Sequence, residues 1–579
     1  MFKLKYILPA AALVLTTSCS DFLEEQLPQG TLSQEQALQV KNTEAMVVAA
    51  YAGLTTIEDI NASFSLWNYD VRSDDAYKGG ANEGDGDVFH KIETGNGILP
   101  SDWSINGGEG IWARLYNFIS RTNTALALLN STNETTFPQK NTRIAEMKFL
   151  RAYGHFQLKR LFGNIPFVLN ENLKADDYYN ISNVEFDNNE GWALLAHELE
   201  DAYEYLPVKQ ADKGRPTKAA CAALLAKVYL YKAYRKHPGK NTFSGEVNKD
   251  DLLRVVEFTA PSIYENYDLE ADFHNNFRPE EEFENGVESI WAVQYSFNDG
   301  SVNGNRNFGC ALMAPNVEGA TTGGHDFYKP SQNLVNAFRT DRNGLPMDNF
   351  NARDYDVSSD NVDPRLFLTV GMVGFPFMFN PNYIQQKDWA RNASGLYGYN
   401  ICLKYNVDLG YVGKDTYIKK CGWCWATSMN RQVLRLADVK LMRAEALAQL
   451  NINPDEVANI IKSIRDRAAA STNLILDYHK RYGVNFKVGN YDRARFHSKE
   501  EALRIIKFER RLELAMEAER FFDLVRWGDA KTVLDQFYAA DPTGLYKNSN
   551  FTENKLEYMP IPFNEIQSSN NLYKQNPGY

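Results

Sequence analysis

The chain has 579 residues, with 62 Lys and Arg against 74 Asp and Glu, and a formal net charge of −12. A surface of this sign repels phosphate groups, which argues against nucleic-acid binding and against adhesion to anionic lipid. Phe, Trp and Tyr make up 13% of the residues, enough to build a large core.

Residues 1–18 have the pattern of a secretory signal peptide. A basic start precedes an apolar run from residue 6 to residue 15, which is too short to cross a bilayer, and small residues lead up to Cys19. The pattern resembles a bacterial lipobox, although Thr16 stands where leucine is commoner. Cleavage before Cys19 would make it the lipidated N-terminus, and residues 19–35 would then form a polar tether. The alternative is an ordinary signal peptide with a chance cysteine.

Helical periodicity recurs over residues 36–269. Apolar residues return every three or four positions, which is the pattern of one buried helix face. The expected helices span residues 43–54, 111–129, 144–162, 192–206 and 218–236. Thr217 is placed to cap the last one, whose many alanines let a neighbouring helix approach closely. Successive helix pairs of this kind predict antiparallel hairpins stacked in a tetratricopeptide-like solenoid.

The composition changes over residues 270–430, where Gly, Asn, Asp and aromatic residues dominate. This pattern predicts a loop-rich insert with short β-hairpins, and a long insert on a rigid scaffold is a place for function. Cys421 and Cys424 form a C-x-x-C motif that lacks the context of a redox site and the further ligands of a zinc site. The motif therefore favours a local disulfide or two free thiols.

Helices return in a second part of the scaffold, residues 431–579. Its expected helices span residues 433–450, 454–470 and 499–528. Charged residues recur three or four positions apart in the last of these helices, and such pairs stabilise a helix and join it to its neighbours. We therefore assign Glu509, Arg510 and Glu513 to the scaffold and not to a catalytic site.

Specific motifs run along the chain. They are the segments 151–166, 214–229, 435–446, 508–514 and 517–528, followed by Met-Pro-Ile-Pro at 559–562 and the closing residues 575–579. Together they resemble the SusD/RagB family of nutrient-binding lipoproteins of the Bacteroidetes, and the resemblance covers essentially the whole mature chain.

The resemblance implies a mainly α, SusD-like superhelix of tetratricopeptide-like hairpins with a loop-rich insert. It implies a lipoprotein on the outer membrane that faces the cell exterior, binds a glycan and delivers it to a SusC-like TonB-dependent transporter. No cofactor and no metal is expected. Some relatives serve peptide uptake, so a peptide or another nutrient is the alternative ligand.

The sequence contains none of the common catalytic motifs, neither a G-x-S-x-G elbow nor an H-E-x-x-H pair. A glycosidase needs only two well-placed carboxylates, so a surface hydrolase is the other alternative, against which the helical architecture argues. Asp85-Gly86-Asp87 is only a fragment of a calcium-binding loop.

Sugars present C–H faces flanked by hydroxyls, so a glycan site needs aromatic rings with polar side chains beside them. The loop 70–103 combines these groups with glycines, and we expect it to converge with the insert on one shallow platform. The predicted glycan contacts are Arg72, Asp74, Asp75, Tyr77 and Trp103 from the loop, and Tyr295, Phe297, Asn298 and Tyr328, with its neighbour Phe327, from the insert. Trp112, Trp192, Trp291 and Trp527 lie on regular segments and are assigned to the core.

Overall fold

The computed structural model describes residues 40–58, 70–103, 110–296, 307, 312–315, 317, 324–391, 395–411, 417–421 and 424–579. The signal peptide, Cys19, the tether, Phe297 and Asn298 lie outside the described residues. The same holds for the side chains of Trp103, Cys421 and Cys424. The domain boundaries expected from the sequence stay a prediction.

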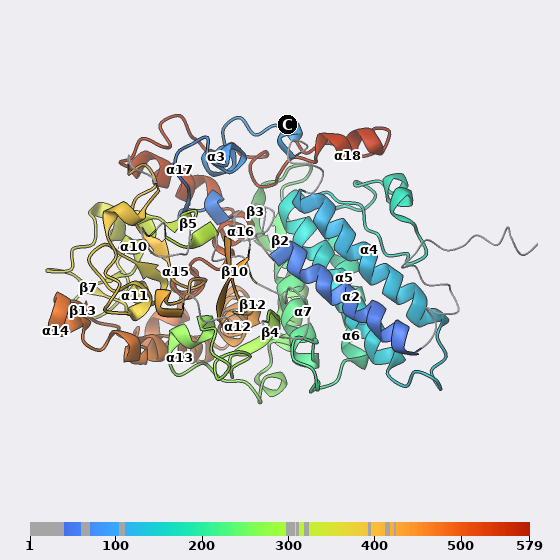
Figure 1. The fold of residues 1–579 in the computed structure, drawn as a ribbon, viewed down its shortest axis with the longest axis horizontal. Helices are drawn as coiled ribbons and strands as arrows, with labels where there is room; N and C mark the ends of the chain where they lie inside the picture. Colours follow the sequence, from blue (N-terminus) through green and yellow to red (C-terminus); the bar gives the residue numbers. More distant parts are fainter. Residues whose placement is uncertain are drawn as a thin grey trace, which may run out of the picture.

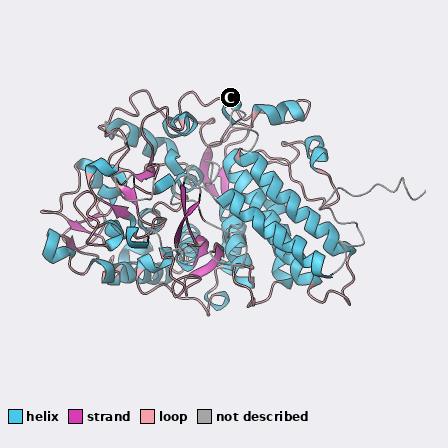
Figure 2. Ribbon diagram, viewed as in Figure 1, coloured by secondary structure: helices cyan, strands magenta, loops and turns pink. Residues whose placement is uncertain are grey.

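About half of the described chain is helical, and the first helices form an antiparallel stack (Figures 1 and 2). The stack consists of α2 (Val40–Glu58), α4 (Ile111–Ser131), α5 (Lys140–Phe162), α6 (Asn188–Tyr205), α7 (Lys218–Ala233) and α8 (Lys249–Phe258). Each helix packs mainly on the next, which confirms the predicted helical-hairpin scaffold. No helix in the described part of the chain is long and apolar enough to cross a membrane.

Local sequence explains the ends of these helices. The Thr217 hydroxyl accepts a hydrogen bond from the backbone N–H of Ala220, so it caps α7 as predicted. Asp187 and Glu190 form a capping box at the start of α6. Gly163, with φ at 71°, ends α5.

The second part of the scaffold packs directly on the first. Its helices are α12 (Leu436–Leu450), α13 (Pro454–Ala470), α14 (Tyr478–Tyr482), α15 (Lys499–Glu513), α16 (Arg520–Trp527), α17 (Ala530–Ala540) and α18 (Phe563–Ser568). Helix α12 lies against α8, the last helix of the stack. The 177 residues from Thr259 to Arg435 leave the stack after α8, and the chain returns to it at α12. The insert therefore projects from one continuous scaffold.

In three of the expected helices, some residues form a different element in the structure. The chain turns into a short strand, β2 (Tyr234–Lys236), directly after α7, because these residues pair with β3 (Phe243–Val247). Similarly, β12 (Arg431–Arg435) precedes α12 and pairs with β4 (Ser289–Val293). The helix expected over 499–528 is two helices, with Met516 and Ala518 between them at φ of 62° and 65°.

The insert carries short helices and small sheets, as expected. The helices α10 (Gln332–Ala337) and α11 (Arg365–Thr369) alternate with β5 (Phe327–Pro330), β6 (Arg339–Thr340), β7 (Asn361–Val362), β8 (Val370–Gly371), β9 (Ile401–Cys402), β10 (Ile418–Cys421) and β11 (Cys424–Thr427). Strand β7 pairs with both β6 and β13 (Asn485–Phe486), β8 pairs with β9, and β10 pairs with β11.

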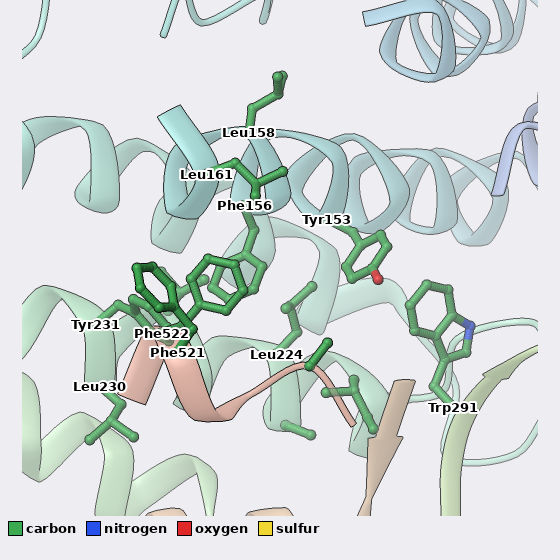
Figure 3. Close-up of a cluster of buried hydrophobic side chains, with 14 of the residues drawn as sticks. Tyr153, Phe156, Leu158, Leu161, Leu224, Leu230, Tyr231, Trp291, Phe521 and Phe522 are labelled. Atoms are coloured by element: carbon green, nitrogen blue, oxygen red, sulfur yellow. The ribbon is translucent and has the colours of Figure 1, made fainter. Parts of the chain in front are cut away.

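A cluster of aromatic side chains joins the scaffold to the insert and to α16 (Figure 3). Tyr153 on α5 meets Trp291 on β4 edge-on, with ring centroids 5.1 Å apart. Phe156 contacts Tyr231 on α7 in the same way at 5.4 Å. All four tryptophans that the sequence assigns to the core are buried.

Buried ion pairs tie α15 to the insert. Glu509 lies 2.7 Å from Arg365 on α11 and 2.9 Å from Arg465 on α13, and none of these side chains is exposed. Glu513 contacts Arg365 and Arg435 at 2.9 and 2.7 Å. Burial alone would raise the pKa of Glu513, but the surrounding arginines hold it well below its usual range. These charges are structural, as the helical spacing indicates.

Candidate functional site

Two segments 250 residues apart meet in a small antiparallel sheet. Strand β1 (Ala76–Gly79), in the loop predicted to bind ligand, pairs with β5 of the insert, so that Tyr77 lies opposite Lys329 and Gly79 opposite Phe327. A Cβ atom on Gly79, whose φ is 81°, would lie 2.3 Å from the carbonyl oxygen of Asp326. The absence of a side chain at Gly79 is therefore what lets the two segments approach.

Asp74 and Asp75 of the loop are buried and bound by arginines of the second scaffold part. Asp74 lies 3.0 Å from Arg511 and 2.9 Å from Arg520. Asp75 lies 2.7 Å from Arg511. Burial would raise the pKa of Asp74, yet the two guanidinium groups hold it below its usual value. These pairs fix the loop on α15 and α16.

Arg72 is also buried, and its guanidinium stacks on Phe521 at 3.8 Å from the ring centroid and donates to the carbonyl of Leu556. These contacts place it in the same framework as the two aspartates. The expectation of exposed charges is therefore wrong for Arg72, Asp74 and Asp75, because each finds its partner inside the protein.

The two predicted tyrosines at this sheet are buried as well. Tyr77 is 3% exposed and donates from its hydroxyl to Asp541 over 2.6 Å. Tyr328 is fully buried and donates to Asp70 over 3.0 Å. Neither ring reaches the surface, so both tyrosines pack beneath the sheet. These two rings therefore do not form an exposed platform.

Tyr295 follows β4 and lies beside a different sheet. Its side chain is 6% exposed, and its backbone N–H donates to Asn430, just before β12. The convergence expected between the loop and the insert is therefore present at Tyr77 and Tyr328 but does not include Tyr295. Direct glycan contact by the predicted group as a whole stays a prediction.

Two half-buried rings lie at the edge of the β1–β5 sheet. They are Phe327, on β5, which the sequence analysis selected together with Tyr328, and Tyr399, just before β9, which it did not select; β9 packs on β5. Tyr397 lies buried, and the Lys78 ammonium stands 4.9 Å from its centroid and 5.3 Å from that of Phe327. The Gly-Leu-Tyr-Gly-Tyr run at residues 395–399 is the sequence signal that marks Tyr397 and Tyr399.

Charged and polar groups surround these rings. Asp85 lies 3.0 Å from Arg391, which donates to the carbonyl of His325 over 3.1 Å. Lys387 stands 5.5 Å from the ring centroid of Tyr399. Below we call Phe327, Tyr399, Asp85, Arg391 and His325 the rim. Apolar faces with hydrogen-bonding groups beside them are what a sugar needs.

Lys78 holds the turn that borders the rim. Its ammonium donates to the carbonyls of Asn82 and Asp85 over 3.0 and 2.5 Å and so ties the two ends of the Asp85 turn together. Burial lowers the pKa of Lys78 to about 8. Among the described residues, no group of three or more His, Cys, Asp or Glu side chains could hold a metal ion.

Two family models match the chain. One, described as the SusD family, matches residues 287–579, and another, described as starch-binding and associating with the outer membrane, matches residues 32–230. The chain is 25% identical to SusD-like protein P2 of Formosa agariphila, covering 99% of this chain and 100% of the relative. It is 24% identical to SusD-like protein P25 of the same organism, over 95% and 94%.

Solved structures agree on the fold. A laminarin-binding SusD-like protein superposes with a TM-score of 0.66 at 22% identity, covering 93% of this chain and 99% of that one. Surface glycan-binding protein A from Bacteroides thetaiotaomicron, in complex with laminarihexaose, gives 0.64 at 20% identity and the same coverage.

Proposed function

Because the chain belongs to the SusD family, we propose that it is a surface lipoprotein that captures glycan at the rim and passes it to a TonB-dependent transporter of the outer membrane. In this proposal Cys19 carries the acyl chains and the tether lets the folded part stand off the membrane. The protein performs no reaction on the glycan.

The observation that carries this proposal is the pairing of β1 with β5, which sets two half-exposed rings beside charged groups. A sugar can lie with its C–H face on Phe327 or Tyr399 while its hydroxyls bond to Asp85 and Arg391. The buried tyrosines and aspartates below hold this surface in shape. Trp103, Phe297 and Asn298 keep their predicted role as further ligand contacts.

A shallow surface of this kind gives modest affinity, because it buries little area and still orders the ligand. Modest affinity suits a protein that must release glycan to a transporter. The related proteins described above, whose names state glycan or laminarin binding, support the same class of ligand.

The experiment is affinity electrophoresis of the purified protein through gels that contain one polysaccharide each, with a peptide mixture tested separately by calorimetry. We expect retardation by at least one polysaccharide and none in the Phe327→Ala/Tyr399→Ala double variant. Release of reducing ends from the retarding polysaccharide would reveal a hydrolase. Heat of binding with peptides alone would favour the peptide alternative.

A further inference from the structure

A groove of about 640 Å³ opens at the first turn of α7, apart from the rim. It is bounded by the connection 207–217 between α6 and α7, by the chain around η4 (Pro261–Ile263), and by residues 285–292, which lead into β4. This volume lies in the range of sites that enclose small ligands. In Figure 1, β4 lies in the lower half of the view and β5 in the upper half.

Fixed aromatic rings line the groove. Tyr203 is half-buried and packs edge-on against Phe258, with ring centroids 5.5 Å apart. Tyr267 is half-buried too, and its hydroxyl lies 3.4 Å from that of Thr217. Trp291 is buried in the wall and donates from its indole N–H to the carbonyl of Gly214 over 2.8 Å. Rings held from behind in this way offer apolar faces without an ordering cost.

The groove also carries positive charge that the protein does not neutralise. Lys209 and Lys213 are exposed and Lys218 is half-buried, and none of the three has a carboxylate partner among the residues that the structure describes. The Lys218 ammonium lies over the Tyr203 ring, 4.8 Å from its centroid, so it also borders one face of that ring.

The other charged groups of the groove cancel in part. Arg215 is bound by three carboxylates, those of Asp212 at 2.8 Å, Glu44 at 2.6 Å and Glu146 at 2.8 Å, which leaves Glu265 as the acid in the groove lining opposite the three lysines. An excess of cations in a concave site is unexpected for a protein with a net charge of −12. It would attract an anionic ligand and repel a cationic one.

We propose that this groove is an accessory binding site for an acidic oligosaccharide, one that carries uronate carboxylates or sulfate esters. The sugar faces lie on Tyr203 and Tyr267, and the anionic groups accept from Lys209, Lys213 and Lys218. Charge-assisted hydrogen bonds of this kind are stronger than neutral ones, so the groove distinguishes acidic from neutral glycans.

The test uses pairs of probes that differ only in charge. They are trigalacturonic acid with its methyl ester, and a κ-carrageenan hexasaccharide, which has sulfate esters but no uronate, with its desulfated form; the two pairs separate the carboxylate from the sulfate source. Binding is measured by calorimetry on the full folded protein and on the Lys209→Gln/Lys213→Gln/Lys218→Gln variant. The matched control, Lys240→Gln/Lys249→Gln/Lys480→Gln, removes the same charge at exposed sites outside the groove.

We expect at least one acidic probe to bind about tenfold more tightly than its uncharged partner, with an affinity that falls as salt is added. The groove variant should lose about tenfold in affinity, and the control should match the native protein. Absence of binding by both acidic probes, equal binding of a charged and an uncharged partner, or equal affinity of the groove variant and the control would overturn the proposal.

We expect binding of the acidic probes in the groove to be independent of the rim. Acidic probes should bind equally to the Phe327→Ala/Tyr399→Ala double variant, so failure of the groove proposal and failure of the proposed function give different outcomes. Equal melting temperatures of the native protein and the two lysine variants establish that the lysine substitutions leave the fold intact. Loss of acidic-probe binding in the rim variant would overturn the separate groove.

Discussion

Two consecutive segments of the loop that begins at Asp70, residues 70–80 and 81–87, both contain acidic residues and glycines but have opposite environments. Residues 70–80 are buried, and their aspartates are paired with arginines of α15 and α16. Residues 81–87 are mostly exposed, and Asp85 there meets Arg391 at the rim. The comparison teaches that an acidic loop with glycines and a ring can be a framework or a ligand surface, depending on its distant partners.

The largest expected effect lies in the buried half. Replacing Arg511 by Met leaves Asp75 buried without its cation, which should cost about 3–5 kcal/mol of unfolding free energy. Denaturant unfolding measures this loss. The control is Arg504→Met on the same helix, whose ion pairs are exposed and should contribute less than about 1 kcal/mol. Equal losses in the two variants would remove the distinction between framework and surface.

The buried half also predicts a pH dependence. Burial, reinforced by Asp75, raises the pKa of Asp70 to about 7, whereas an unfolded aspartate titrates near about 4. The stabilisation by protonated Asp70 is therefore complete below about pH 4 and is lost as the pH rises through about 7.

Relative to Asp70→Asn, the native protein should lose about 1.4 kcal/mol of unfolding free energy per pH unit across that window. Denaturant unfolding of both proteins at about pH 5 and about pH 7 measures the difference. Parallel pH profiles would mean that Asp70 is already ionised in the folded protein.

The two half-buried rings of the rim, Phe327 and Tyr399, should affect glycan affinity and not stability. Phe327→Ala and Tyr399→Ala should each weaken glycan binding by about tenfold, because each removes one apolar face. Calorimetry with an oligosaccharide of the retarding glycan measures this. Phe563→Ala, which removes a ring 47% exposed on α18, is the control and should bind normally. A strong loss of stability with Phe327→Ala would move this residue into the framework.

The smallest effect is expected at the charged edge of the rim. Arg391→Gln should weaken glycan binding a few-fold and change stability by less than about 1 kcal/mol, because the pair with Asp85 is partly exposed. Affinity and melting temperature together test this. Lys462→Gln, which breaks an exposed pair with Asp466, should change neither. A melting temperature as low as that of Arg511→Met would contradict the division of the loop.

Local signals in the sequence predict the scaffold well. The apolar period, the Thr217 cap and the stop at Gly163 act over a few residues, so the helices near them are placed almost correctly. Short strands replace expected helical turns at Tyr234–Lys236 and Arg431–Arg435, because each pairs with a partner outside its own segment.

The candidate site depends on longer range. Asp75 pairs with Arg511 after 436 residues, and β1 pairs with β5 across the stack from α4 to α8 and the start of the insert. No pattern within the loop reveals these partners, so the sequence predicts that the loop and the insert meet but assigns exposure to side chains that are buried. That Phe327 and Tyr399 lie at the edge of one sheet becomes visible only when the sheet is formed.

A crystal structure of the protein with a bound oligosaccharide tests the central claim most directly. The account predicts a sugar ring stacked on Phe327 or Tyr399, with its hydroxyls on Asp85 or Arg391, and an intact glycosidic bond. A glycan bound elsewhere with both rings uncovered, or a cleaved one, would contradict it.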